Sequence, residues 1–422
     1  MHTALPLQRL LNRKRLAYAW IAGGAVWIAW LVSMVLGPGN VDLAGHVIGA
    51  DYLQFYTAGY TLRLGESPRL YEFDYQSQLQ RELIGPQLRS YHAFITPPFL
   101  AWLYVPFAAL PYRVSFVAWS LLGLLGLWIS IHLLGTQDPR WAFGWSLTWY
   151  PVFATFSFGQ NAWLSLVLLS LIYWLWRKER LWAAGMACSL LMYKPQLTIG
   201  VGLLWLLEWR RQLPALLGLI LGSSILACLS FWKLPAASWA YLEFARTILP
   251  NLPDWHDFPL WYLHTVRGFW RLLLPQHPAW ADGLTLLLAA LGVLGFLLFW
   301  RRYRRQDALL FAGAICFTLW VTPHAMIYDW TLLLIPAVLL WREVPQFREA
   351  WKTLFAWVWL VGLLSWMLTL AQLQVLPFAV QISVPVLLLV IYLAYRWLLD
   401  LPLPDHHWPQ FAKADATWQS LT

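Results

Sequence analysis

The sequence predicts an all-α polytopic membrane protein, one bundle of about 12 transmembrane helices. Of its 422 residues 60% are hydrophobic and 12% are charged, whereas soluble domains are about half apolar and a quarter charged. Apolar runs of about 20 residues recur, and each is long enough to cross about 30 Å of hydrocarbon as a helix. The cations that give the net charge of +9 gather in short basic stretches, which is typical of cytoplasmic loops and indicates no nucleic-acid partner.

The N-terminal part predicts one helix followed by a large outer loop. We expect residues 16–36 to form a retained first helix, because the run is too long for a signal peptide and no clean cleavage pattern follows. Residues 37–95 form the first extracytoplasmic loop, and apolar residues at helical spacing near 51–64 and 74–84 indicate amphipathic helices on the membrane surface.

The remaining apolar segments alternate with basic loops. Pro97, Pro98, Pro106 and Pro111 mark the stretch 97–111 as the segment that does not cross, because proline removes helical hydrogen bonds and an even number of crossings suits the basic loops. We expect a second extracytoplasmic loop at 232–280 and a polar tail at 401–422, with residues 1–400 as a single domain. The other expected helices are 113–134, 141–157, 160–176, 181–193, 196–209, 214–231, 281–300, 307–322, 326–341, 353–371 and 378–397.

The sequence lacks the motifs of several common classes of enzyme and transporter. Nucleotide-binding glycine loops, a Gly-x-Ser-x-Gly elbow and a His-Glu-x-x-His pair do not occur, and the three cysteines lie in apolar segments without paired spacing. Asp254, His256 and Asp257 have the residue types of a metal site but not its spacing, so we expect no metal and no cofactor. Most of the 32 tryptophans are expected to be anchors at the membrane interface.

Four polar positions lie at predicted outer ends of helices: Asp51, the pair Gln160-Asn161, Lys194 and His324. Each has a plain structural explanation, since an acid or amide can cap a helix, a lysine can reach the interface and a histidine can be an ordinary interfacial residue. The predicted topology nevertheless places all four on one side. A carboxylate, a cation, an imidazole and an amide that converge can bind an anionic group and move a proton.

The order of several short motifs resembles glycosyltransferase family 87. The resemblance rests on Asp51-Tyr52-Leu53-Gln54-Phe55-Tyr56, the stretch from Phe94 to Pro98, Gly159-Gln160-Asn161, Lys194-Pro195 and Thr322-Pro323-His324, and it covers about residues 45–340. It implies a GT-C-type helical bundle, and the short cytoplasmic loops without a eukaryotic targeting tail favour a bacterial inner membrane. It also implies an inverting enzyme that uses a polyprenyl-phosphate sugar, chiefly mannose, on the extracytoplasmic face.

The resemblance also implies roles for individual residues. Asp51 takes the place of the general base, and His324 would position the acceptor or the phosphate. Lys194 would bind the donor phosphate together with Arg63 or Arg267, and Tyr56, Gln160 and Asn161 would contact the substrate. The acceptor would be a glycolipid or a glycan.

Other functions remain open from the sequence alone. A related enzyme could move a pentose, a transporter or flippase could carry a lipid-linked substrate without covalent chemistry, and a scaffold for envelope assembly would need neither. A transporter predicts charges along a path through the bundle, whereas this sequence gathers its polar groups at one face.

Overall fold

The computed structural model describes residues 13–254 and 258–400, and these residues form an all-helical bundle without a β-strand. Five helices are long and apolar enough to cross a membrane: α1 (Arg13–Leu36), α5 (Tyr112–Leu133), α11 (Trp209–Lys233), α14 (Pro278–Tyr303) and α17 (Arg348–Leu373). The all-α membrane class is thus confirmed, while the count of about 12 crossings stays a prediction. Shorter apolar helices are α8 (Ala162–Arg177), α9 (Leu181–Ser189), α10 (Ile199–Leu207), α15 (Asp307–Val321) and α18 (Ser383–Leu399).

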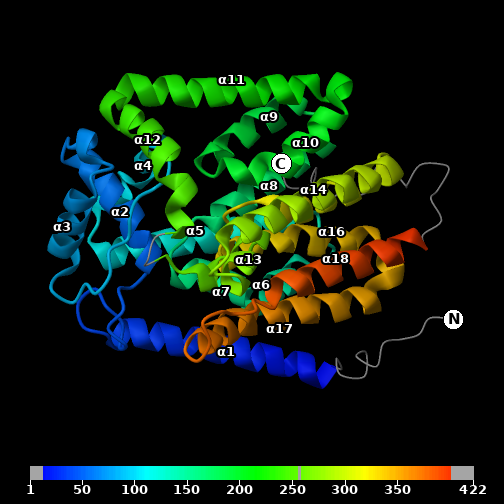
Figure 1. Ribbon diagram of the computed structural model, residues 1–422, viewed down its shortest axis with the longest axis horizontal. Helices are drawn as coiled ribbons and strands as arrows, with labels where there is room; N and C mark the ends of the chain where they lie inside the picture. Colours follow the sequence, from blue (N-terminus) through cyan, green and yellow to red (C-terminus); the bar gives the residue numbers. More distant parts are fainter. Residues whose placement is uncertain (1–12, 255–257, 401–422) are drawn as a thin grey trace, which may run out of the picture.

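The smaller helices lie mainly at one end of the bundle. Figure 1 shows α2 (Ala50–Arg63), α3 (Phe73–Ile84) and α4 (Phe99–Tyr104) beyond the C-terminal end of α1, with α12 (Pro235–Thr247) beside them. The predicted outer segments 37–95 and 232–280 therefore each contain several short helices. The remaining α-helices are α6 (Pro139–Thr148), α7 (Tyr150–Ser157), α13 (Val266–Leu273) and α16 (Leu334–Glu343).

The basic stretches meet at one end of the bundle. Arg177, at the end of α8, pairs with Asp307 at 3.4 Å, and Arg211 pairs with Glu179 at 2.7 Å. Gln160 and Asn161 precede the first residue of α8, so its 16 residues separate them from Arg177 by about 24 Å at 1.5 Å per residue. The amide pair and the basic stretches therefore occupy opposite ends, as the predicted topology requires.

Prolines divide two of the expected segments. The stretch 97–111 contains only the six residues of α4 and a 3₁₀ turn at Phe107–Ala109, which agrees with the expectation that it does not cross. The expected single helix at 141–157 is wrong, because it breaks at the extended residue Trp149 into α6 and α7. Pro151 cannot donate to the carbonyl of Leu147, and its ring would clash there.

Two tryptophans satisfy the carbonyl groups at this break. The indole of Trp27 on α1 donates to the Leu147 carbonyl at 2.7 Å, and that of Trp359 on α17 donates to the Thr148 carbonyl at 2.8 Å. These two side chains are structural partners of a broken helix, in addition to any role at the interface.

Short 3₁₀ segments flank the polar residues of the late part of the chain. Lys194 separates the 3₁₀ turns Leu190–Tyr193 and Pro195–Thr198, which continue α9 and open α10. The expected helix at 326–341 begins instead as the 3₁₀ segment Ile327–Leu333 and becomes α-helical only in α16. Further 3₁₀ segments are Ser67–Arg69, Leu249–Asp254, Leu260–Tyr262 and Pro345–Phe347.

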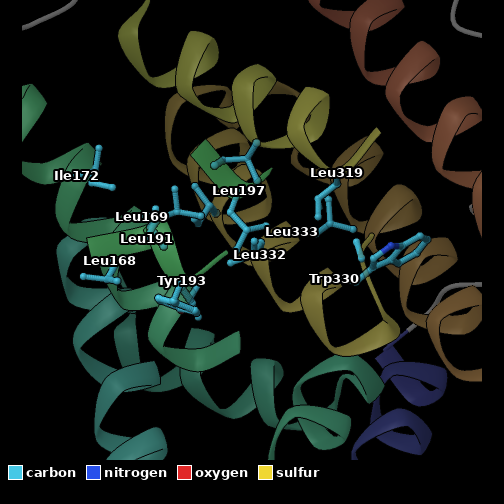
Figure 2. Packing of buried hydrophobic residues seen from close by; sticks show 14 of the residues in the cluster. Leu168, Leu169, Ile172, Leu191, Tyr193, Leu197, Leu319, Trp330, Leu332 and Leu333 are labelled. Carbon is cyan, nitrogen blue, oxygen red and sulfur yellow. The ribbon is translucent and has the colours of Figure 1, made fainter. Parts of the chain in front are cut away.

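A buried apolar layer holds these segments. Figure 2 shows Leu191, Tyr193 and Leu197, which flank Lys194, packed toward side chains of α8 and of the 3₁₀ segment that carries Asp329. Their partners, all buried, are Leu168, Leu169, Ile172, Trp330, Leu332 and Leu333. The backbone around Lys194 and Asp329 is therefore fixed by packing in the core.

Candidate active site

Two glycines place Asp51 beside Gln160. Gly49 precedes α2 with φ of 65°, and Gly159 precedes Gln160 with φ of 68°, a region that glycine adopts without strain. A Cβ at Gly49 would lie 2.3 Å from the Phe116 ring, and one at Gly159 would lie 2.5 Å from the Cβ of Tyr52. Both turns therefore pack on the same wall, where only glycine fits.

A backbone hydrogen bond joins the two turns. The Tyr52 N–H in the first turn of α2 donates to the Phe158 carbonyl at 2.9 Å. Because the first N–H groups of a helix lack partners within it, this bond both satisfies α2 and fixes it on the end of α7.

The carboxylate of Asp51 accepts a hydrogen bond from a neutral amide. Gln160 Nε2 lies 2.9 Å from Asp51 Oδ2 and 3.1 Å from the hydroxyl oxygen of Tyr328. The other carboxylate oxygen, Oδ1, is 3.6 Å from Nδ1 of His92. The Asp51 side chain is 23% exposed, so a substrate can reach it.

Lys194 forms a buried ion pair. Its Nζ donates to Asp329 Oδ1 at 2.8 Å, with side chains that are 12% and 3% exposed. Asp329 Oδ2 accepts the Met326 N–H at 3.0 Å, so both carboxylate oxygens are engaged. The ammonium also lies 5.2 Å from the ring centre of Tyr328, a cation–π contact.

Tyr328 joins the two carboxylates into one polar cluster, which we define as Asp51, His92, Gln160, Lys194, Tyr328 and Asp329. The pKa of its hydroxyl is raised well above the ordinary value, first by burial and then by the negative charges of Asp51 and Asp329. The hydroxyl is therefore a neutral hydrogen-bonding group at physiological pH.

His324 lies in the loop next to this cluster, and its ring centre is 5.8 Å from that of Phe258. Burial lowers the pKa of His324 to about 4, Lys194 and Arg267 act in the same direction, and Asp329 opposes them. The imidazole is therefore neutral near pH 7, when one ring nitrogen donates and the other accepts.

The loop of His324 is anchored to the second outer segment. The backbone N–H of His264 donates to the Ala325 carbonyl at 2.9 Å, and Leu263 forms an antiparallel bridge with Met326. Arg267, three residues beyond His264, lies 3.9 Å from Asp282 and donates to the Pro250 carbonyl at 3.3 Å. This anchoring brings a guanidinium group close enough to affect His324.

Three expected substrate contacts lie outside the polar cluster. Arg63 is 12 residues beyond Asp51 on α2, about 18 Å along the helix axis, and donates to the Ala108 carbonyl. The Tyr56 hydroxyl donates to the Leu110 carbonyl at 2.8 Å, and the helical phase turns it away from Asp51. Asn161 is fully buried next to the hydroxyl of Tyr104. Arg63 and Tyr56 thus have structural partners, whereas the side-chain amide of Asn161 is buried without a hydrogen-bond partner among the described residues.

Sequence reasoning missed His92, Tyr328 and the pairing of Asp329 with Lys194. The pairing was missed because a contact across 135 positions leaves no local spacing signal. The available signal for His92 was its place just before the stretch from Phe94 to Pro98. His256 and Asp257, considered above as metal ligands, lie outside the described residues.

One comparison with known proteins gives a match. The model of glycosyltransferase family 87 matches residues 94–323, more than half of the chain. The matched range contains Gln160, Asn161 and Lys194. It begins after Asp51 and His92 and ends one residue before His324. A search of the curated proteins and a search of the solved structures each find no match.

Proposed function

Since the chain belongs to glycosyltransferase family 87 and is a membrane glycosyltransferase, we propose that it transfers mannose from a polyprenyl-phosphate sugar to an extracytoplasmic acceptor. The acceptor is a glycolipid or glycan, and the site faces away from the basic end of the bundle in the inner membrane. Asp51 is the general base in this proposal.

The contrast between the two carboxylates of the polar cluster carries the proposal. Asp329 is almost completely buried, paired with Lys194 and bonded to a backbone N–H. Asp51 is more exposed, and its nearest partner at 2.9 Å is the neutral amide of Gln160. A base needs a free lone pair within reach of the substrate, so Asp51 rather than Asp329 suits proton transfer.

The reaction requires one proton acceptor and one site for negative charge. The acceptor oxygen forms a bond to the anomeric carbon as its proton passes to Asp51. The bond from that carbon to the phosphate oxygen breaks, and its electron pair leaves with the polyprenyl phosphate. Attack from the side opposite the leaving group inverts the configuration of the sugar.

Lys194 is placed to stabilise the leaving phosphate. An ammonium group has three N–H donors, and Asp329 accepts from one of them. The others can bind phosphate oxygens as their charge develops, which lowers the barrier more than tight binding of the intact donor would. Neutral His324 can donate to the same group, and Arg267 adds positive charge nearby.

The test is sugar transfer in proteoliposomes. Purified protein receives radiolabelled polyprenyl-phosphate mannose, glucose or arabinose in separate reactions, with total membrane lipid as the pool of acceptors. We expect label to enter glycolipid from the mannose donor, and Asp51→Asn to lower the rate by at least about 10²-fold.

Asp42→Asn is the matched control. Asp42 lies in the same outer segment with a similarly exposed side chain, but its carboxylate pairs with His46 outside the polar cluster. Transfer by Asp51→Asn at the wild-type rate would refute the base assignment. Movement of the intact labelled donor across the bilayer without transfer would favour the flippase.

A further inference from the structure

We propose that His92 receives the proton that Asp51 takes from the acceptor and passes it through Ser90 to the outer solution. This inference rests on the proposed function and extends it, because it assigns the step that returns Asp51 to its ionised form after each transfer. His92 acts through Asp51 and is a positioning and relay residue.

A row of neighbouring polar atoms from Asp51 to Ser90 supports the relay. His92 Nδ1 lies 3.6 Å from Asp51 Oδ1, on the oxygen that Gln160 does not occupy. The other ring nitrogen, Nε2, lies 3.1 Å from the hydroxyl oxygen of Ser90. Ser90 is exposed, whereas the His92 side chain is only 18% exposed. The imidazole thus bridges the carboxylate of Asp51 and bulk water.

The segment that carries His92 is held rigidly on α3. The fully buried Gln80 accepts the His92 N–H at 3.0 Å and donates to the His92 carbonyl at 2.6 Å. One turn earlier on α3, Gln76 accepts the Phe94 N–H at 2.8 Å and the Tyr91 hydroxyl at 3.1 Å. Two buried amides therefore fix the segment by its backbone, which leaves the imidazole free for another role.

The proton balance is simple. A neutral imidazole with its hydrogen on Nε2 presents a lone pair at Nδ1. After the sugar is transferred, the O–H bond of protonated Asp51 breaks as the Nδ1–H bond forms, which gives a carboxylate and an imidazolium. The imidazolium then loses its Nε2 proton by way of the Ser90 hydroxyl to water.

The charges around His92 come from few elements. Asp51 on α2 is the charged group in contact with the ring, and α3 presents the neutral amide of Gln80. The next charges, on the far side of Gln160 and Tyr328, belong to the ion pair of Lys194 and Asp329, which is neutral as a pair. Asp51 is therefore the group with which the imidazole can exchange a proton.

The experiment compares kcat and KM for sugar transfer in wild type and in His92→Gln. Glutamine keeps a polar side chain but cannot carry the proton. We expect kcat to fall about 10- to 100-fold, less than the loss of a direct acid or base, with KM for polyprenyl-phosphate mannose unchanged.

Chemical rescue separates the relay from a structural role. Free imidazole in the buffer should restore His92→Ala toward the wild-type rate, and more so as rising pH increases its neutral fraction. His46→Gln is the control, because His46 also lies beside an aspartate in the first outer segment but is exposed and pairs with Asp42 instead of Asp51. It should behave as wild type.

Two results overturn the relay. One is a His92→Gln enzyme with unchanged kcat, and the other is an inactive His92→Ala enzyme that imidazole does not restore. If Asp51→Asn is inactive while His92→Gln is normal, the relay alone fails. If Asp51→Asn is active, the proposed base fails as well.

Discussion

Loss of Lys194 should destabilise the fold through the charge that it leaves behind. In Lys194→Met the long apolar side chain keeps much of the volume, but Asp329, with 3% exposure, loses the partner at 2.8 Å. The Met326 N–H remains as one hydrogen bond to a buried carboxylate. Breaking a buried pair on one side typically costs about 3–5 kcal/mol, and we expect a loss in this range.

A double-mutant cycle identifies the cause. Asp329→Asn alone should cost less, because Lys194 is more exposed and keeps the Tyr328 ring as a neighbour. Adding Asp329→Asn to Lys194→Met removes the uncompensated charge, so the double variant should recover to within about 1–2 kcal/mol of wild type. Sugar transfer should stay lost in all variants without Lys194.

The assay is SDS-induced unfolding of the purified protein, followed by loss of tertiary structure. Lys352→Met is the control, since its pair with Glu349 has side chains 43% and 78% exposed and should contribute at most about 1 kcal/mol. A Lys194→Met protein within 1 kcal/mol of wild type, or a double variant no more stable than the single one, refutes the reasoning.

Two further predictions concern the glycine turn and a buried histidine. Gly159→Ala should lower the free energy of unfolding by about 2–4 kcal/mol and remove most of the transfer activity, because it combines backbone strain at positive φ with a clash against Tyr52. Gly65 also has positive φ but lies in open space, so Gly65→Ala should cost only about 1 kcal/mol. Unfolding and transfer assays compare the two variants. Burial lowers the pKa of His264 from 6.5 to about 3. Below pH 6.5 the unfolded chain therefore binds a proton that the folded chain excludes. The free energy of unfolding then falls by up to about 1.4 kcal/mol for each pH unit. His264→Gln should flatten the unfolding free energy between pH 6.5 and 5, and an equally steep fall would contradict this assignment.

The helices could be predicted wherever the sequence has a long apolar segment. The first helix and the segments that became α5, α11, α14 and α17 are clear because sustained apolar composition outweighs local detail. The break at Trp149 was missed because it depends on carbonyl partners that come from Trp27 and Trp359, which are distant in sequence. Proline marks where a helix can break, but tertiary partners decide whether the break is stable.

The candidate site was predictable in its location more than in its contacts. The topology placed Asp51, Gln160 and Lys194 at one end, and the structure links them through Tyr328. The sequence could not give the phase of side chains on α2, so it did not show that Arg63 bonds to the Ala108 carbonyl outside the polar cluster. Nor could it show that Lys194 has a carboxylate partner, because the two residues meet only when separate segments pack together.

Small and apolar residues, and not the reactive groups themselves, place Asp51 and Gln160. Gly49 and Gly159 both pack against Phe116, and the Tyr52 N–H bonds to the Phe158 carbonyl. None of these contacts uses the carboxylate of Asp51 or the amide of Gln160. Removing the charge of Asp51 should therefore leave the two turns in place, so that a loss of transfer in Asp51→Asn reports on chemistry while a loss in Gly159→Ala reports on geometry.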